Sequence, residues 1–300
     1  MRRLTQIMQS IVRRFTISVR CRLFVVLGIF RRTLTFNTKQ GRLTVSSQDR
    51  GLGRELYTNQ AFEFDLQERV FAWMDAEKIP RQGGAILDIG ANMGVISVGM
   101  LYGNHFKHAI AIEPDPINFN LLRLNVRQNG LEDRFSCLNA AAGRNEGKLK
   151  FELSAINYGD HRVHTEESLL KQELCNESVR NIIEVPSNTL DALLETVPSS
   201  VSDIIRLVWI DVQGYECIVF EGGRGVFSRD IPVFAEIWPY GMRSCGVRFD
   251  EYYNAVKNLW RYFWVFRKGR FLRYDISCLL KLIEENDIRS ERDNIILTKK

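Results

Sequence analysis

The stretch Asp88-Ile89-Gly90-Ala91-Asn92-Met93-Gly94 directly follows an apolar run and contains two glycines. Residues 85–89 have the composition of a short buried strand, and residues 95–102 that of a helix. Glycine permits the tight turn between such a strand and helix, and it lets a ligand approach the backbone without meeting a Cβ atom. The stretch therefore predicts a strand–turn–helix unit with a ligand site at the turn.

The segments that follow repeat this alternation. Asp115 is a good N-cap, Pro116 suits the first helical position, and Gly130 is expected to end that helix. Strands alternating with helices indicate an α/β fold with a mostly parallel, doubly wound, Rossmann-like sheet. Further helices are predicted at residues 64–77 and 190–194. Strands are predicted at residues 109–112, 135–138, 148–153, 182–185, 207–212, 233–237, 262–266, 271–274 and 294–297, with a polar loop at 154–181.

Two carboxylates indicate which cofactor the turn binds. Glu113 ends the second strand, where it can accept hydrogen bonds from ribose hydroxyls. Asp88 precedes the turn, where it would repel the pyrophosphate of NAD. S-adenosylmethionine (SAM) has no phosphate and two positive centres, so it is favoured over NAD. The alternative is that Asp88 caps backbone amides and Glu113 is a solvated residue at a helix start.

Several motifs, in order and spacing, resemble the FkbM-type SAM-dependent methyltransferases over about residues 35–300. The motifs lie at residues 86–94, 112–119, 138–141, 189–191 and 210–216, with a further similar segment at 49–63. The resemblance implies a class I methyltransferase fold and O-methylation of hydroxyl groups, often on sugars or secondary metabolites. It implies these SAM-binding residues: Asp88, Gly90, Ala91, Asn92, Gly94, Glu113, Pro114, Asn139 and Ala140. Trp209 and Gln213 depart from the family pattern, which leaves the substrate class open.

The fourth parallel strand supplies a candidate for acting on the acceptor. Asp211 is expected to end that strand on the ligand side of the sheet, where it could orient or deprotonate a hydroxyl group. The alternative is a structural carboxylate that caps the helix start at residues 214–216. Gln213 and Glu236 are expected to contact the acceptor. Trp238 could stack on a sugar face or belong to the core.

The loop at residues 157–164 is the second candidate region. His161 could act as a base, because its reference pKa lies near neutrality. Tyr158, Asp160 and Arg162 could bind a glycan. The alternative is a surface loop with a salt bridge. No further ligand accompanies the two histidines of this loop, so no metal site is predicted.

The N-terminal segment differs from the rest in charge. Residues 1–48 contain ten basic side chains and no acidic one, whereas the remainder is slightly acidic. Leu4, Met8, Ile11 and Phe15 follow helical spacing. We therefore divide the chain into a basic amphipathic leader, residues 1–48, and a methyltransferase domain, residues 49–300. Residues 1–33 could contact an anionic membrane, pack on the domain, or form a disordered tail.

Composition bounds the function further. The acidic body argues against a broad nucleic-acid-binding face, and an Asn/Asp-Pro-Pro-aromatic run is not found after the fourth strand. Six scattered cysteines without a Cys-x-x-Cys pair fit a reducing compartment, so a cytoplasmic enzyme is expected, with a peripheral membrane location left open. The oligomeric state is undetermined. The alternative function is a membrane-associated SAM-binding protein without catalysis.

Overall fold

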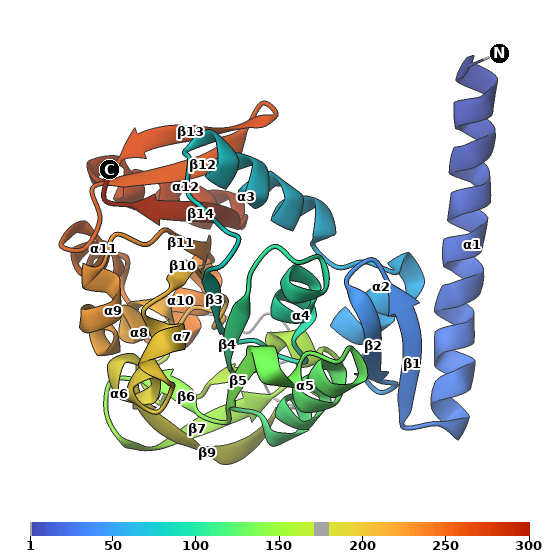
Figure 1. Ribbon diagram of the computed structural model, residues 1–300, viewed down its shortest axis with the longest axis horizontal. Helices are drawn as coiled ribbons and strands as arrows, with labels where there is room; N and C mark the ends of the chain where they lie inside the picture. Colours follow the sequence, from blue (N-terminus) through green and yellow to red (C-terminus); the bar gives the residue numbers. More distant parts are fainter. Residues whose placement is uncertain (1, 171–179) are drawn as a thin grey trace.

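The computed structural model describes residues 2–170 and 180–300, with side chains from Phe15 onward. An eight-stranded sheet occupies the centre, in the order β13-β12-β14-β11-β10-β3-β4-β5 (Figure 1). Five neighbouring strands are parallel: β11 (Val233–Ile237), β10 (Ile205–Ile210), β3 (Ala85–Ile89), β4 (His108–Ile112) and β5 (Phe135–Leu138). Three antiparallel strands complete the sheet: β14 (Asp293–Thr298), β12 (Tyr262–Arg267) and β13 (Arg270–Asp275). The predicted mostly parallel α/β fold is confirmed.

The central strands are apolar on both sides because each side faces its own core. Leu87 and Val208 point to a core formed with α8 (Glu216–Gly222), α11 (Phe249–Lys257) and α12 (Leu279–Arg289). Ile86 and Leu207 point to the other core, formed with α3 (Phe64–Ala76), α4 (Val95–Tyr102) and α5 (Pro116–Gln128). Helices on both faces are what near-continuous apolar strands require.

The capping prediction for α5 is confirmed in detail. The Asp115 carboxylate accepts the backbone N–H groups of Ile117 and Asn118. Pro116 occupies the first helical position. These interactions satisfy donors that a helix start leaves unpaired. They also fix the chain direction immediately after Glu113.

A second sheet lies beside the carboxyl ends of the central strands. It consists of β6 (Ala141–Gly143), β9 (Asn181–Thr189), β7 (Gly147–Leu153) and β8 (Arg162–Val163), in that order. The two strands predicted here are confirmed, and they extend beyond the predicted limits. The polar segment between them contains the short helix η2 (Tyr158–Asp160) and β8. Residues 171–179 of that predicted loop lie outside the described residues.

Strand β10 ends earlier than predicted. It stops at Ile210 rather than at residue 212, and Asp211 is the first residue beyond it. The backbone N–H of Asp211 still donates to the carbonyl of Ile89, at 3.0 Å. Asp211 therefore starts the loop at the carboxyl end of β10, beside the turn that follows β3.

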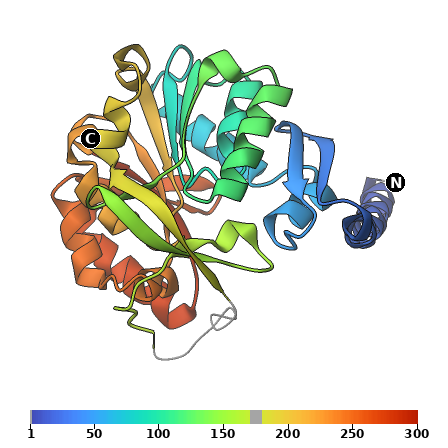
Figure 2. The same cartoon turned by 90° about the horizontal axis from the view of Figure 1, so that it is seen from below.

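The N-terminal segment forms the long helix α1 (Arg2–Phe30) and a hairpin of β1 (Thr33–Thr38) and β2 (Gly41–Ser46). The hairpin joins the domain, since the N–H of Thr44 donates to Asn125 of α5 at 2.7 Å. Helix α1 contacts α2 (Leu52–Asn59) and stands beside the rest of the molecule (Figures 1 and 2). The apolar side chains predicted over residues 4–12 lie outside the described side chains, whereas Phe15 is exposed.

In the described part of the chain, we find no helix that combines the length and the apolar character needed to cross a membrane.

Candidate active site

A cavity of about 750 Å³ opens at the carboxyl ends of β3, β4, β10 and β11. This volume is typical of small-molecule sites. Many of the residues predicted from the sequence line it: Asp88, Gly90, Ala91, Asn92, Glu113, Pro114, Ala140, Tyr158, Asp160, His161, Asp211, Gln213 and Glu236. Gly94, Asn139, Arg162 and Trp238 are not among the lining residues.

The glycine turn, residues 90–94, requires glycine because of its packing within the protein. Gly90 has a φ of +82°, and a Cβ atom there would lie 1.9 Å from the backbone oxygen of Asp211. Gly94 has a φ of +84°, and its Cβ atom would lie 2.5 Å from Leu122. Positive φ angles are strained for residues with a side chain. The first glycine thus lets the loop after β10 approach the turn after β3.

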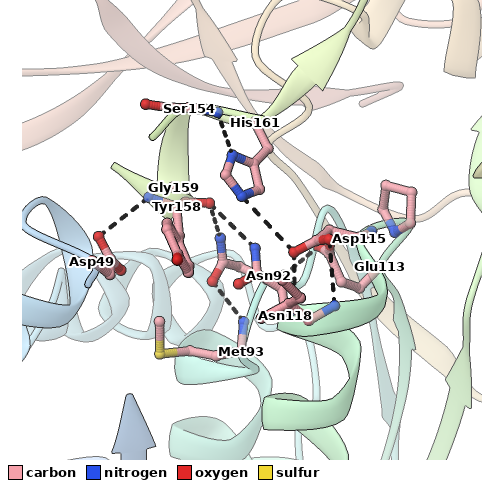
Figure 3. A network of polar contacts seen from close by, with 12 residues as sticks. Asp49, Asn92, Met93, Glu113, Asp115, Asn118, Ser154, Tyr158, Gly159 and His161 are labelled. Atoms are coloured by element: carbon pink, nitrogen blue, oxygen red, sulfur yellow. Dashed lines mark hydrogen bonds and ion pairs between the residues drawn. The ribbon is translucent and has the colours of Figure 1, made fainter. Parts of the chain in front are cut away.

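The Glu113 carboxylate supports this turn through hydrogen bonds with the main chain. Its two oxygens accept the backbone N–H groups of Asn92 and Asp115, each at 2.8 Å (Figure 3). Burial raises the pKa of Glu113 to about 8. Glu113 is buried, which is contrary to the alternative of a solvated residue at a helix start. A carboxylate has about four acceptor sites, so it can still accept from a ribose hydroxyl.

Asp88 lines the cavity and is almost completely buried. One of its carboxylate oxygens has no hydrogen-bond partner. Burial raises the pKa of Asp88 to about 7, and nearby polar groups of Ser97 offset part of this effect. A buried carboxylate without a partner is costly, and a positively charged ligand group would relieve that cost.

Asn139 and Ala140, the two residues predicted to contact the cofactor after the third strand, differ in position. Ala140 lines the cavity. The side-chain amide of Asn139 instead donates to the backbone oxygens of Glu113 and Pro114, at 2.8 and 3.1 Å. Asn139 therefore holds the loop after β4 in place, and the structure does not place its side chain in the cavity.

A carboxylate cluster, which we define as Glu63, Asp211 and Glu236, occupies the other side of the cavity. Asp211 is exposed to the cavity, and its carboxylate accepts a hydrogen bond from the Gln213 amide. Removal from bulk water raises the pKa of Asp211, while Gln213 and Arg292 oppose the rise. Three like charges in one cavity disfavour full ionisation.

Glu236 and Arg292 form the outer part of this region. A guanidinium nitrogen of Arg292 lies 3.5 Å from one Glu236 oxygen, and the other Glu236 oxygen has no partner. Burial raises the pKa of Glu236 to about 8, and the charge of Asp211 adds to this rise. The Arg292 guanidinium also lies 4.0 Å from the centre of the Trp238 ring. Trp238 itself is buried in the protein, as its alternative interpretation had it.

Sequence reasoning missed Glu63 and Arg292 as cavity residues. Glu63 precedes α3 with a left-handed φ of +48°, and removal from bulk water raises its pKa to about 7. Glu63 belongs to the segment 49–63 that resembles the family, and this resemblance was the signal that could have identified it. Arg292 lies just before β14, and nothing in the local sequence distinguished it from other arginines.

The alternative interpretation of Asp211 as a structural cap has partial support, because the Gln213 backbone N–H interacts with its carboxylate. The backbone N–H groups of Val212 and Gly214 donate to the carboxylate of Glu216, at 3.2 and 3.3 Å. The Glu216 carboxylate therefore stabilises this loop through two backbone hydrogen bonds. The Asp211 carboxylate is left facing the cavity.

His161 is placed at the cavity wall, but its surroundings contradict the predicted role as a base. Its Nδ1 accepts the backbone N–H of Ser154 at 3.0 Å, and its Nε2 points toward Asp115 at 3.8 Å (Figure 3). Burial lowers the pKa of His161 to about 4, and Arg180 adds to the effect. The neutral ring with its proton on Nε2 has no lone pair left to take a proton.

The rest of the loop is tied to the side of the glycine turn by its main chain. The carbonyl of Tyr158 accepts the side-chain amides of Asn92 and Asn118, at 2.7 and 3.3 Å. The N–H of Tyr158 donates to Asp49 at 3.2 Å (Figure 3). The loop therefore closes over the glycine turn.

Two polar loop residues are engaged within the protein. Asp160 lines the cavity, and its carboxylate pairs with Arg180 at 2.5 Å. Arg162 is fully buried beside Glu152, at 3.3 Å, so its predicted contact with an acceptor is not supported. Across residues 2–170 and 180–300, we find no group of three or more acidic, histidine or cysteine side chains placed to hold a metal ion.

Comparison with known proteins gives one family. The sequence model of the family described as "Methyltransferase FkbM domain" matches residues 88–261. A search of curated proteins found no match.

Similar solved structures include the methyltransferase FkbM of Methylobacillus flagellatus, with a TM-score of 0.37, 15% identity and coverage of 72% of this chain. The chain spans 43% of that protein. The Pyrococcus horikoshii TYW2 in complex with MeSAdo gives a TM-score of 0.39 and 12% identity, covering 90% of this chain and 72% of the other. The B. subtilis tRNA methyltransferase TrmK gives a TM-score of 0.37 and 10% identity, covering 78% and 66%. The family is shown by the match over residues 88–261, which is more than half of the chain.

Proposed function

Because the chain belongs to the FkbM family of SAM-dependent methyltransferases, we propose that it methylates a hydroxyl group of a sugar, glycan or small secondary metabolite. The observation that carries the proposal is the position of Asp211. Its carboxylate enters the cavity from the loop that directly follows β10, the strand next to the one that carries Asp88. A candidate base and a candidate cofactor site therefore share one cavity.

The cavity suits SAM. When bound, SAM supplies a methyl group carried on a positively charged sulfur. The neutral thioether left after methyl transfer, S-adenosylhomocysteine, is a good leaving group. Asp88 would face a positive centre of the cofactor, which would supply a partner for its unpaired oxygen. Glu113 would accept from the ribose, and the glycine turn would border the cofactor.

On the acceptor side, Asp211 takes the proton of the hydroxyl group. Removal from bulk water raises its pKa, which makes it a stronger base than an ordinary aspartate. Gln213 donates to one Asp211 oxygen and thereby orients the carboxylate. The unpartnered oxygen of Glu236 can accept from a second hydroxyl of a polyol. These residues position the acceptor oxygen, which is the main requirement of methyl transfer.

The test is methyl transfer from labelled SAM to a panel of sugars, glycans and hydroxylated metabolites, followed through S-adenosylhomocysteine. We expect product with a hydroxylated acceptor and little product with Asp211→Asn. The matched control is Asp230→Asn, an exposed carboxylate that pairs with Lys300. SAM binding without transfer to any acceptor would instead support the non-catalytic alternative.

A further inference from the structure

Helix α1 has two unlike faces. Ile17, Cys21, Phe24 and Gly28 recur at helical spacing on the inner face. Phe24 is fully buried and its ring lies 5.5 Å from that of Tyr57 on α2. Gly28 approaches the chain so closely that a Cβ atom would lie 3.2 Å from the backbone oxygen of Ser47. This face fixes the helix to the domain.

The outer face is mostly apolar and exposed. Phe15, Val19, Val26 and Ile29 follow spacings of four, seven and three residues, which places them on one stripe, and Arg22 falls within that stripe, four residues before Val26. Phe15 is 71% exposed and Ile29 is 73% exposed. Half of the exposed large apolar side chains in the described part of the chain lie on α1. They are Phe15, Val19, Leu23, Val25, Val26, Ile29 and Phe30.

The charges around this stripe are all of one sign. Arg22 is exposed within the helix, and Arg31 and Arg32 are exposed directly after it. Residues 1–48 contain no aspartate or glutamate. A mostly apolar helix face that includes one arginine and is followed by two more matches an anionic lipid surface. A second copy of α1 is a poorer partner, because pairing would bring these arginines together.

We propose that the outer face of α1 binds the surface of an anionic membrane and lies in its plane. The inner face keeps the helix attached to the domain during binding. Ile17 and Cys21 of that face also line the cavity. The lipid surface would therefore lie about one helix diameter, ~10 Å, from the cavity.

The test uses the full chain with vesicles of phosphatidylglycerol and phosphatidylcholine in equal amounts, and with phosphatidylcholine alone. We expect binding to the anionic vesicles that weakens as salt increases, and much weaker binding to the neutral ones. Ile29→Glu should reduce binding at least about tenfold, because a charge replaces a side chain of the apolar stripe.

The matched control is Ile288→Glu, which makes the same change at an exposed position on α12, away from α1 (Figure 1). It should bind vesicles like the unchanged chain. Calorimetry with SAM checks that each variant is folded. Equal vesicle binding by the two variants would overturn the proposal. So would a dimer, seen by light scattering, that Ile29→Glu dissociates while no form binds vesicles.

Discussion

The two sides of the cavity are built differently. On the side of the glycine turn, Glu113 is bonded to two backbone amides, and Gly90 contacts the backbone of Asp211. In the carboxylate cluster, Asp211 is oriented by one side-chain amide, and Glu236 keeps an oxygen without a partner. The first side is fixed by the main chain. The carboxylate cluster consists of side chains of like charge. Its carboxyl groups can therefore respond to a ligand by changing their protonation.

The largest expected effect comes from a change that breaks the fixed side. Gly90→Ala would place a Cβ atom against the Asp211 carbonyl, at a φ angle that alanine tolerates poorly. We expect a loss of about 3 kcal/mol or more in the free energy of unfolding, together with loss of SAM binding. Thermal unfolding and calorimetry measure both.

Gly83→Ala is the matched control for this change. Its φ of +81° is nearly the same, but no atom lies within 4 Å of the added Cβ. It should cost only about 1–2 kcal/mol and leave SAM binding unchanged. Similar losses in the two variants would mean that the contact between Gly90 and Asp211 contributes little.

The second prediction addresses the carboxylate cluster. Asp211→Asn keeps the shape of the side chain and can still accept from Gln213, but it cannot take a proton at neutral pH. Turnover should fall about 10²-fold or more, while SAM affinity stays nearly constant. Single-turnover kinetics and calorimetry separate the two quantities. A fall in SAM affinity with unchanged turnover would place Asp211 on the cofactor side.

The third prediction concerns the pH dependence of the side of the glycine turn. Asp88 and Glu113 have pKa values raised to about 7 and 8, so both are largely protonated below pH 7. A positively charged ligand prefers the ionised forms. SAM affinity should therefore rise by about tenfold between pH 6 and pH 8, a free-energy change of ~1.4 kcal/mol. Calorimetry at several pH values tests this, and a flat profile would contradict it.

The smallest effect is expected for His161→Asn. The Asn oxygen can replace Nδ1 as the acceptor of the Ser154 N–H group, so turnover should change only a few-fold. His161→Phe removes that acceptor and should cost about 1–3 kcal/mol of stability by leaving the N–H unpaired. Steady-state kinetics and thermal unfolding distinguish these outcomes. A 10²-fold loss of turnover in His161→Asn would restore the role of His161 as a base.

The sequence predicted the parts of the site whose positions follow from the order of strands and turns along the chain. Asp88 and Glu113 could be placed because each lies at or next to the carboxyl end of a buried strand, and such ends meet at one edge of a parallel sheet. Glu63 and Arg292 line the cavity because of how the elements that follow them, α3 and β14, pack in the tertiary structure. Local sequence spacing does not indicate this position. The position of His161 at the cavity was predicted correctly, but its role as a base was not. The sequence does not show that the lone pair of Nδ1 already accepts a hydrogen bond from the backbone.

The contact between Gly90 and the Asp211 backbone has a consequence for how this enzyme can diversify. It joins the turn proposed to border the methyl donor to the loop that carries the candidate base. The contact is made by main-chain atoms, so side-chain substitutions elsewhere leave it in place. Their relative alignment is thus inherited with the main chain. We expect substitutions at Tyr158 or Glu236, which line the cavity, to alter which acceptor fits without disturbing that alignment. Under the proposed function, substrate range could then change while the reactive geometry is preserved.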